Sequence, residues 1–419
     1  MEVLIIGSRG REHALAIELL KDSRVEKLHC IPGNGGISQI ATCVDNVNIN
    51  NYDEIEKYLD ENKNIELVIV SPDELLFKGF ADKLREKGLK VIGCSSKCAE
   101  LETNKEFCNA ILKKYNIPSP GYKVFSDYAL AKKYVQNKQF PIVVKSNGRS
   151  AGKAIVYCTK YTQVENALYD MMVIRTFGEA GKKVCIEDYV QGVNVIVPGF
   201  CDGDTIKLLP AVENYKRVFD AEMGLNTAGM GAVVPCSKYN SLVEEKVYNQ
   251  IAKPLINGLK DSGYEYVGMI GLNIIITPEG DPILVDLVSR FPDVESQVII
   301  PQIKTSFIDI FDAIINKTLD KLELNYEDAC GVCVVLTSGG YPLEYVKNIR
   351  ISIGKTDDTV NIYHAGTKLV DGEFKTSGGR VLAVSSIGTT KEECSENVYK
   401  NIKNISFDGM HYRRDIKGK

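Results

Sequence analysis

The sequence has no excess of positive charge and no long apolar run. Lysine and arginine together number 51 against 55 aspartate and glutamate residues, so the formal net charge is −4. A chain without a basic surface field gives no indication of a nucleic-acid partner. No stretch reaches the roughly 18 to 20 consecutive apolar residues of a membrane-spanning helix, and no charged-then-apolar leader follows Met1. We therefore expect a cytoplasmic protein that binds neither nucleic acid nor membrane.

The twelve cysteines show neither a disulfide framework nor a zinc-binding pattern. They are spread singly along the chain, mostly inside apolar runs, which is typical of reduced and buried thiols. The one CxxC, Cys330 and Cys333, falls in the segment CGVCVVL, which predicts a strand in which residues three apart point to opposite faces. No second CxxC with a histidine partner completes a zinc site. The cysteines are thus predicted to be structural.

Length and hydrophobic alternation predict several domains. A chain of 419 residues exceeds the roughly 250 to 300 residues at which a single core stops growing, so about three domains are expected. From residue 1 to about 100, β-type runs such as VLIIG and ELVIV alternate with helical patterns over 10–21, 53–62 and 76–86. This alternation predicts a parallel, doubly wound α/β unit.

The remainder of the chain changes character at two points. After a helix over 104–116, residues 121–190 contain two strands joined by the glycine-rich stretch NGRSAGK, which is typical of a mobile flap. Residues 193–322 are richer in long strands, and LNIII and ILVDLV are joined by the turn sequence at 278–281. From 330 onward the pattern predicts a small mixed domain.

Two glycine-rich stretches near the N-terminus can hold an anion. Gly7 and Gly10 flank a strand-to-helix turn beside Arg11, and the glycines at 33–36 offer unhindered amides beside Asn34. The same pattern also occurs at the ordinary joints of a doubly wound sheet, so both interpretations stay open.

Further along the chain, lysines suggest a polyphosphate site. Lys145 ends an apolar strand and Lys153 closes the glycine-rich loop, although Ala154 after it departs from the Walker pattern. Lysines at strand ends are also commonly just solvated. Residues 187–190 can present the backbone donor and acceptor that an adenine edge requires, or simply end a strand.

Two later stretches carry polar groups in apolar or glycine-rich surroundings. The loop over 215–231 is too long and too polar for a plain linker, and its composition suggests ordered anion binding. Asp286 lies on one face of ILVDLV, where a carboxylate can hold Mg²⁺. Arg290 follows that strand and can hold a substrate carboxylate.

Together these stretches resemble one family, glycinamide ribonucleotide synthetase (phosphoribosylamine–glycine ligase), whose members are ATP-grasp enzymes of purine biosynthesis. The resemblance covers nearly the whole chain. Its motifs are, in order, GREHAL, PGNGG, SPDELL, LETNKEF, VVKSNGRSAGK, IEDYVQG, YKRV with GLNTAGMGA, RFPDVESQ, GGYP, HAGTK, GGRVL and YRRDI.

The resemblance implies an α/β protein with the ATP-grasp fold. The implied division is an N-terminal doubly wound domain over 1–103, a central ATP-grasp domain formed by 104–120 and 191–325, a flap over 121–190 and a small mixed α/β C-terminal domain over 326–419. Such an enzyme is expected to be a monomer or a weak homodimer.

The implied activity is that of an ATP-dependent carbon–nitrogen ligase. ATP and glycine give a glycyl phosphate, whose phosphate is displaced by the amine of 5-phosphoribosylamine to form glycinamide ribonucleotide. No protein nucleophile is needed, so positioning and charge stabilisation dominate. The implied cofactors are ATP and Mg²⁺ or Mn²⁺, and the partners are small molecules.

The resemblance also implies roles for individual residues of this chain. The catalytic residues are Arg290 and Lys145, and the metal ligand is Asp286. The residues expected around the nucleotide are Lys105, Lys145, Lys153, Glu187, Asp188, Tyr189, Val190 and Asn194. The residues expected around the two other substrates are Gly10, Arg11, Gly33, Asn34, Gly35, Pro72, Asp73, Asn214, Lys216, Asn226, Thr227, Arg290, Asp293, His364, Thr367 and Lys368.

This chain departs from the family pattern around nucleotide, metal and amino acid. Asp286 and Val288 stand where the family has Glu and Asn on the metal strand, and an isopropyl group cannot coordinate Mg²⁺. Asn194 and Asn214 stand where the family has acidic residues, and RFPDVE replaces RFGDPE. Two alternatives therefore accompany the ligase prediction. The chain could be a diverged ligase that uses a different amino or carboxylic acid, or a non-catalytic protein that binds a phosphoribosyl ligand.

Overall fold

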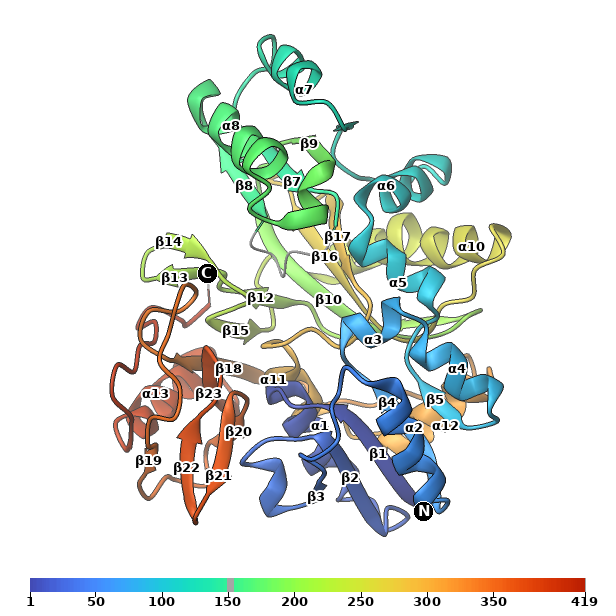
Figure 1. Cartoon of the computed structure of the whole chain (residues 1–419), viewed down its shortest axis with the longest axis vertical. Helices are drawn as coiled ribbons and strands as arrows, with labels where there is room; N and C mark the ends of the chain where they lie inside the picture. The colour runs from blue at the N-terminus through green and yellow to red at the C-terminus, as the bar shows by residue number, and fades with distance from the viewer. Residues whose placement is uncertain (149–153, 419) are drawn as a thin grey trace.

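The computed structural model describes residues 1–148 and 154–418. Figure 1 shows a narrow upper lobe built from the flap, above a broad body in which the N-terminal segment and the C-terminal segment lie on opposite sides. The central strands run between them. The chain is mixed α/β, as the sequence predicts.

The N-terminal part is a parallel sheet with the strand order β3-β2-β1-β4-β5. Its strands are β1 (Glu2–Gly7), β2 (Lys27–Pro32), β3 (Thr42–Cys43), β4 (Ile65–Val70) and β5 (Lys90–Ile92). Its helices are α1 (Gly10–Leu19), a 3-10 turn (Ile37–Gln39), α2 (Tyr52–Glu61), α3 (Asp73–Phe77), α4 (Phe80–Glu86) and α5 (Ser96–Thr103). The predicted doubly wound unit is confirmed.

One predicted helix in this part is divided. The pattern over 76–86 predicts a single helix, whereas the structure has α3 and α4 separated at Gly79. Gly79 has a φ of 80°, a left-handed conformation that glycine adopts without strain. This break ends α3 after little more than one turn and leaves Asp73 at its N-terminal end.

The flap is an antiparallel sheet in the order β6-β9-β7-β8, with helices over one face (Figure 1). Its elements are β6 (Tyr122–Phe125), α7 (Tyr128–Val135), β7 (Ile142–Ser146), β8 (Ile155–Cys158), α8 (Tyr161–Leu168), a π-helical turn (Tyr169–Ile174), a 3-10 turn (Gly178–Lys182) and β9 (Val184–Asp188). Val144, Leu168 and Ile186 are fully or almost fully buried between sheet and helices.

A long antiparallel sheet joins the central part to the C-terminal part. Its strand order is β17-β16-β10-β12-β15-β18-β23-β20, and the sheet passes from the central part to the C-terminal part where β15 pairs with β18. Its strands are β10 (Val193–Asp202), β12 (Val212–Asn214), β15 (Gly231–Val234), β16 (Val267–Ile276), β17 (Pro282–Val288), β18 (Cys330–Thr337), β20 (Asn361–His364) and β23 (Arg380–Gly388). The predicted hairpin at 278–281 is confirmed, since Thr277 N donates to Asp281 O over 3.0 Å.

The remaining elements flank this sheet. The helical ones are α6 (Lys105–Lys114), α9 (Ser241–Lys246), a π-helical turn (Val247–Ala252), α10 (Lys253–Asp261), α11 (Ser296–Ile299), a 3-10 turn (Ile300–Gln302), α12 (Phe307–Ile315) and α13 (Lys391–Ile402). The strand β11 (Ile206–Leu208) pairs with β10 and belongs to the long sheet. The other short strands form separate two-stranded sheets and are β13 (Arg217–Phe219), β14 (Met223–Asn226), β19 (Ser352–Ile353), β21 (Thr367–Val370), β22 (Glu373–Thr376) and β24 (Ile405–Ser406).

A shared apolar core fixes the parts of the lower body against one another. One cluster of buried side chains includes Ile5 of β1, Phe200 of β10, Val298 of α11 and Val335 of β18. Burial of side chains of this size stabilises by about 1.5 to 3 kcal/mol each. The division into four domains stays a prediction, because both the core and the long sheet run across its boundaries.

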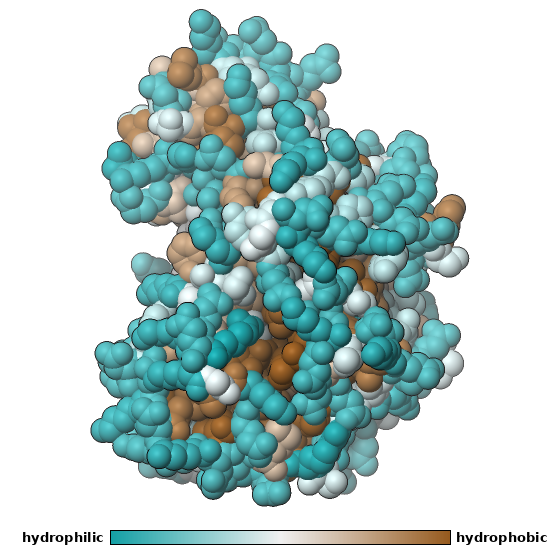
Figure 2. Space-filling model, turned by 90° about the vertical axis from the view of Figure 1, so that its right-hand side faces the viewer, coloured by the Kyte–Doolittle hydropathy of each residue, from teal (hydrophilic) through white to brown (hydrophobic). Residues whose placement is uncertain are grey.

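The surface and the cysteines agree with the composition. The face shown in Figure 2 is mostly hydrophilic, with apolar patches on the upper lobe and in the middle and lower part of the body. None of the helices in the described part of the chain is long and apolar enough to cross a membrane. Cys333 is fully buried in β18, and all twelve cysteines are free thiols, ten of which are buried.

Candidate active site

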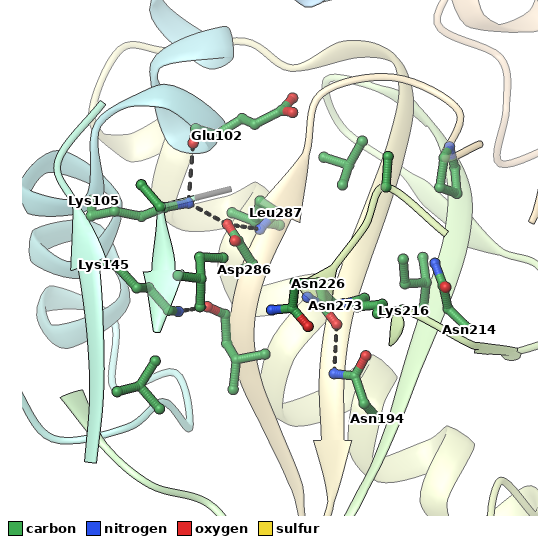
Figure 3. A pocket seen from close by; sticks show the side chains of 18 of the residues that line it. Glu102, Lys105, Lys145, Asn194, Asn214, Lys216, Asn226, Asn273, Asp286 and Leu287 are labelled. Atoms are coloured by element: carbon green, nitrogen blue, oxygen red, sulfur yellow. Dashed lines mark hydrogen bonds and ion pairs between the residues drawn. The ribbon is translucent and has the colours of Figure 1, made fainter. Parts of the chain in front are cut away.

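A cavity of about 620 Å³ opens between the flap, the long sheet and the N-terminal helices. Strand ends and helix ends from each of these parts contribute polar side chains to its wall. Figure 3 shows Lys105 and Lys145 on one side of the cavity, Asp286 beside them, and Asn194, Asn214, Lys216 and Asn226 on the other side. Residues far apart in sequence therefore converge as predicted.

Lys145 lies at the end of the flap strand β7 and is 5% exposed. Its Nζ lies 2.7 Å from Glu187 Oε2 and donates to Val285 O over 2.9 Å. Burial by itself lowers the pKa of Lys145, but the carboxylates of Glu187 and Asp286 outweigh it and hold that pKa above its usual value. A permanently charged ammonium group therefore faces the cavity.

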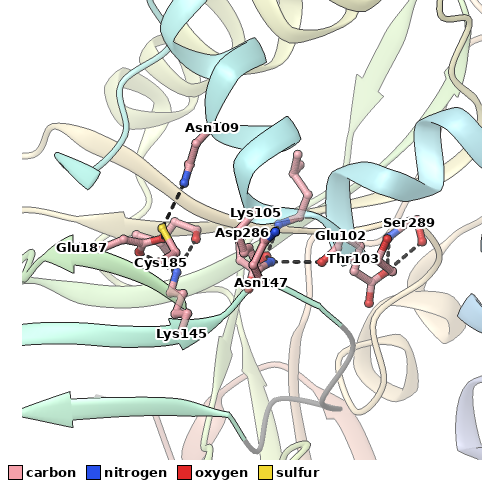
Figure 4. A network of polar contacts seen from close by, with 12 residues as sticks. Glu102, Thr103, Lys105, Asn109, Lys145, Asn147, Cys185, Glu187, Asp286 and Ser289 are labelled. Carbon is pink, nitrogen blue, oxygen red and sulfur yellow. Dashed lines mark hydrogen bonds and ion pairs between the residues drawn. The ribbon is translucent and has the colours of Figure 1, made fainter. Parts of the chain in front are cut away.

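Lys105 supplies a second buried ammonium group from the first turn of α6. Its Nζ donates to Asp286 Oδ1 and, over 3.1 Å, to the carbonyl of Glu102. Burial opposes the charge, yet the Asp286 carboxylate raises the pKa of Lys105. Figure 4 shows this ion pair next to the pair of Lys145 and Glu187. The sequence predicted both lysines but not the side-chain role of Glu187.

Asp286 is the carboxylate between the two lysines. Burial by itself raises the pKa of Asp286, but the charges of Lys105 and Lys145 outweigh burial and hold that pKa below its usual value. The group therefore stays ionised. Val288 lies two residues along β17 and also lines the cavity. No group of three or more His, Cys, Asp and Glu side chains within 1–148 and 154–418 is arranged to hold a metal ion.

Arg290 follows β17 and is held by Glu102. Its Nη1 lies 2.6 Å from both carboxylate oxygens of Glu102, while Ser289 donates to the same carboxylate. The Glu102 charge raises the pKa of Arg290 against the effect of burial. Arg290 Nε is buried and has no hydrogen-bond partner. This donor is available to an acidic ligand.

A set of polar groups lines the opposite wall. Asn194 on β10 donates to Asn273 Oδ1 over 2.8 Å, and its own Oδ1 is buried without a partner. Asn214 on β12 donates to Glu295 Oε1 and also keeps an unpartnered Oδ1. Burial raises the pKa of Glu295. Two residues of the cavity wall thus each keep a buried amide oxygen without a hydrogen-bond partner.

The loop over 215–231 supports the cavity floor. Thr227 Oγ1 and Thr227 N both bond to the carbonyl of Lys216, over 2.8 and 2.7 Å. Thr227 therefore holds the backbone that carries Lys216, whose ammonium group lines the cavity with Asn226. Burial lowers the pKa of Lys216.

Several predicted substrate residues lie elsewhere. Asn34 donates to the carbonyls of Ser8 and His364 and accepts from the amides of Gly36 and Ile37. Eight predicted residues do not line the cavity, and they are Gly10, Gly33, Asn34, Gly35, Pro72, His364, Thr367 and Lys368. Their substrate roles stay predictions. Lys153 lies outside the described residues.

The predicted residues that do line the cavity include the nucleotide set apart from Lys153. They are Lys105, Lys145, Glu187, Asp188, Tyr189, Val190, Asn194, Arg11, Asp73, Asn214, Lys216, Asn226, Thr227, Asp286, Arg290 and Asp293. Sequence reasoning missed Glu102, Asn273, Glu295, Arg9 and Arg380, which also line it. Four of them stand within or next to the quoted motifs, whereas Asn273 is signalled only as a polar residue in the run LNIII.

Comparison with known proteins gives the same family throughout the chain. Three phosphoribosylglycinamide synthetase models match it, the N domain at residues 1–102, the ATP-grasp (A) domain at 103–296 and the C domain at 331–419. The phosphoribosylamine–glycine ligase of Caldanaerobacter subterraneus is 36% identical over 416 residues, which is 99% of either chain.

Solved structures agree in fold. The crystal structure of phosphoribosylamine–glycine ligase from Thermotoga maritima superposes with a TM-score of 0.85 at 26% identity, over 99% of this chain and 100% of that one. The biotin carboxylase domain of the Hydrogenobacter thermophilus 2-oxoglutarate carboxylase, solved with MgADP, gives a TM-score of 0.72 at 14% identity, over 98% of this chain and 91% of that one. The second likeness shows the ATP-grasp fold alone.

Proposed function

The chain belongs to the phosphoribosylglycinamide synthetase family, and we propose that its cavity joins glycine to 5-phosphoribosylamine at the expense of ATP. It is an ATP-grasp carbon–nitrogen ligase of purine biosynthesis, acting on small-molecule substrates. The observation that carries the proposal for this cavity is the convergence of Lys105, Lys145, Asp286 and Arg290 on one wall. The products are glycinamide ribonucleotide, ADP and phosphate.

The lysines fit a bound polyphosphate. Both ammonium groups are buried, cationic and already compensated by carboxylates, so an incoming triphosphate exchanges one anionic partner for another. Exchange of this kind avoids leaving a buried charge unpaired, which is the costly alternative. The unpartnered oxygen of Asn194 fits a donor such as a ribose hydroxyl. We propose that these groups hold ATP.

Asp286 fits Mg²⁺ as a single protein ligand. Mg²⁺ commonly binds through one or two carboxylates and completes its shell with water and substrate phosphates. Asp286 is ionised in this environment, so it can act in this way despite Val288. When bound, the ion neutralises charge on the transferring phosphoryl group.

Arg290 fits the carboxylate of the acid substrate. Glu102 fixes the guanidinium from one side and leaves Nε without a partner. A carboxylate held there lies near the lysine-rich wall, where the terminal phosphoryl group of ATP would be. Its oxygen attacks phosphorus, ADP departs, and the amine of phosphoribosylamine then attacks the acyl carbon and expels phosphate. Orientation and charge neutralisation are the protein's contribution.

Asn214 and Glu295 fit the ammonium group of an amino acid. The free Oδ1 of Asn214 accepts a hydrogen bond, and Glu295 supplies a carboxylate beside it. This arrangement supports glycine as the acid even though Asn214 itself carries no charge. The choice of glycine, a cytoplasmic location and a monomeric or weakly dimeric state are parts of this proposal.

Release of phosphate tests the proposed function. We expect phosphate only when ATP, Mg²⁺, glycine and freshly formed phosphoribosylamine are all present, with glycinamide ribonucleotide as the second product. A panel of other amino acids and simple carboxylic acids is assayed in parallel. Turnover with another acid but not with glycine would replace the substrate, and no turnover with any acid would refute the ligase mechanism in this cavity.

A further inference from the structure

The strands β16 and β17 form part of the cavity floor with one face of their sheet. Asn273 and Asp286 are register partners on these strands, and Figure 3 shows both side chains in the cavity wall. Gly271 and Val288 are the next register partners on the same face, because alternate residues of a strand point to the same side. Arg290 follows two residues after Val288 and also lines the cavity. Along the chain, the Gly271–Val288 pair therefore comes between Asp286 and Arg290.

Under the proposed function, the α-carbon of the acid substrate lies over this pair. Arg290 holds the carboxylate, and the phosphoryl group that the carboxylate attacks lies at the wall of Lys105, Lys145 and Asp286. The α-carbon is bonded directly to the carboxylate, so it lies between these two points. A substituent on this carbon would reach the floor at Val288.

Three apolar residues converge at this point of the floor. A methyl group placed on Gly271 Cα would lie 3.3 Å from Val288 Cβ and 3.5 Å from Ile196 Cγ2. The same methyl group would lie 3.6 Å from Pro292 Cδ. Ile196, Val288 and Pro292 all line the cavity, and we call them the apolar patch. Carbon atoms attract one another best at about 3.5 to 4.0 Å, so the patch is closely packed around the bare glycine.

Two residues of the apolar patch are departures from the family pattern. Val288 stands where the family has Asn, and Pro292 stands where RFGDPE has Gly. The two positions are four residues apart in sequence, yet both changes add apolar carbon at the same place in the cavity wall. Val288 is partly exposed. Glycine has no side chain to cover this surface, whereas an alkyl substituent removes it from water.

We propose that the apolar patch receives an aliphatic substituent on the α-carbon of the acid, so that the cavity ligates a small α-alkyl amino acid such as alanine in addition to glycine. This inference rests on the proposed function and deepens it. The bonds that change are the same for both acids. The carboxylate oxygen attacks the terminal phosphorus of ATP and ADP leaves. The amine nitrogen of phosphoribosylamine then attacks the acyl carbon, phosphate leaves with the bonding electrons, and the nitrogen loses a proton.

The two enantiomers of alanine test the inference in the full-length protein. Phosphate release is measured with ATP, Mg²⁺ and phosphoribosylamine, and with glycine, L-alanine or D-alanine as the acid. We expect one enantiomer to have a KM no higher than that of glycine, because burial of a methyl group strengthens binding roughly 4-fold. The other enantiomer points its methyl group away from the floor and should have a kcat/KM at least about 10-fold lower. Failure of both enantiomers, or equal use of both, overturns the inference.

Two substitutions change the floor in opposite directions. Gly271→Ala raises it by one methyl group and should lower the ratio of kcat/KM for alanine to kcat/KM for glycine by about 10-fold or more, since one carbon in an apolar pocket changes specificity by roughly 10- to 200-fold. Val288→Ala lowers the floor and should raise the corresponding ratio of 2-aminobutyrate to alanine. Because each ratio compares two acids on one protein, a general loss of activity leaves it unchanged. Unchanged ratios in both variants overturn the inference.

Gly388→Ala is the matched control. It also adds a methyl group to a strand glycine, 3.2 Å from Cys394 Sγ on α13. Neither Gly388 nor Cys394 lines the cavity. The ratio of alanine to glycine should therefore equal that of the wild type, and a fall as large as in Gly271→Ala overturns the inference.

The results separate this inference from the proposed function. Phosphate release with glycine but with neither alanine retains the ligase and overturns the inference. If no acid gives phosphate release, the ligase mechanism is refuted, and calorimetric titration of the acids in the presence of ATP and Mg²⁺ decides on the apolar patch. Binding of one alanine enantiomer that is at least as tight as that of glycine, and is weakened by Gly271→Ala, retains the patch. Alanine binding that Gly271→Ala leaves unchanged overturns it.

Discussion

At the scale of single residues, the position of Val288 beside Asp286 distinguishes this cavity. Both side chains belong to the same face of β17, and only one of them can coordinate a cation. If Asp286 holds Mg²⁺ as proposed, substrate phosphates and water supply the rest of the coordination shell. Such a site should work at higher Mg²⁺ concentrations than one with two protein ligands.

Val288→Asn tests this dependence. An amide oxygen at this position adds a ligand, so we expect the Mg²⁺ concentration for half-maximal phosphate release to fall by roughly 10-fold, the smaller effect typical of altered metal partners. A magnesium titration of phosphate release measures it. Val288→Ala, which adds no ligand, should leave the half-maximal concentration near that of the wild type, and an equal fall in both variants contradicts the interpretation.

A second residue-scale prediction concerns the buried pair of Lys145 and Glu187. Lys145→Ala leaves the Glu187 carboxylate buried without its cation, because Glu187 is 4% exposed. We expect the free energy of unfolding to fall by about 3 to 5 kcal/mol, measured by urea denaturation. Replacing both partners by apolar residues should recover most of this loss. Lys182→Ala, in the exposed pair with Glu179, is the control and should cost no more than about 1 kcal/mol.

At the scale of elements, the C-terminal segment clamps the hairpin of β13 and β14. Arg413 is fully buried, bonds to both carboxylate oxygens of Asp415, reaches the carbonyl of Arg217 over 3.1 Å, and lies over the ring of Tyr215. This hairpin lies between Lys216 of the cavity wall and Thr227, which bonds to the Lys216 carbonyl. A residue close to the end of the chain thus supports the site.

Arg413→Ala should therefore loosen the hairpin as well as destabilise the protein. We expect a loss of about 2 to 4 kcal/mol, because buried polar partners remain unsatisfied, together with faster amide hydrogen exchange over 215–226. Arg414→Ala removes the exposed neighbour and is the control, since only its backbone amide bonds to Asp220. Unchanged exchange over the hairpin in Arg413→Ala rules out the clamp.

The sequence predicted elements better than it predicted their partners. Strong apolar periodicity gave the parallel strands near the N-terminus and the hairpin at 278–281, because these are decided by local pattern. It did not give the break at Gly79, since a glycine within a helical pattern reads equally well as a tolerated helix residue. The side-chain contact of Glu187 with Lys145 was also missed, because antiparallel pairing of β7 with β9 is a non-local choice.

The same distinction applies to the site. Lys105, Lys145, Asp286 and Arg290 were predicted because each residue type matches a motif whose chemistry is known. The loop at Asn34 carries an equally good motif, yet the Asn34 amide donates to Ser8 of the N-terminal part and to His364 of the C-terminal part. A motif specifies which atoms are present, and only tertiary structure decides whether they face a ligand or one another.

At the scale of the whole molecule, two buried histidines join the N-terminal and C-terminal parts. His364 N donates to His13 Nδ1 over 2.9 Å, and the two rings meet edge to face. Burial and the neighbouring His364 lower the pKa of His13 to about 3, and burial lowers the pKa of His364 to about 4. Both rings are therefore neutral in the folded protein at neutral pH.

The stability of the protein should consequently fall in acid. The unfolded histidines have a pKa of about 6.5, so between pH 6.5 and about 4 the unfolded state binds more protons than the folded state. The stabilisation is complete above pH 6.5 and is lost as the pH falls, by up to about 1.4 kcal/mol per pH unit for each ring. Urea denaturation at pH 7.5, 6.5 and 5.5 measures the slope. His13→Gln should reduce it, and an identical slope in the variant excludes His13 as a source.

The pairing of β15 with β18 joins the central half and the C-terminal half of the long sheet into one ladder. A fragment ending before Cys330 would leave the side of β15 that pairs with β18 without ladder partners, so β15 would become an edge strand. Unpaired edge strands recruit strands from other chains and promote aggregation. Loss or exchange of the last ninety or so residues would therefore require another segment to cover this edge of β15. This requirement favours evolution by substitution over evolution by domain shuffling.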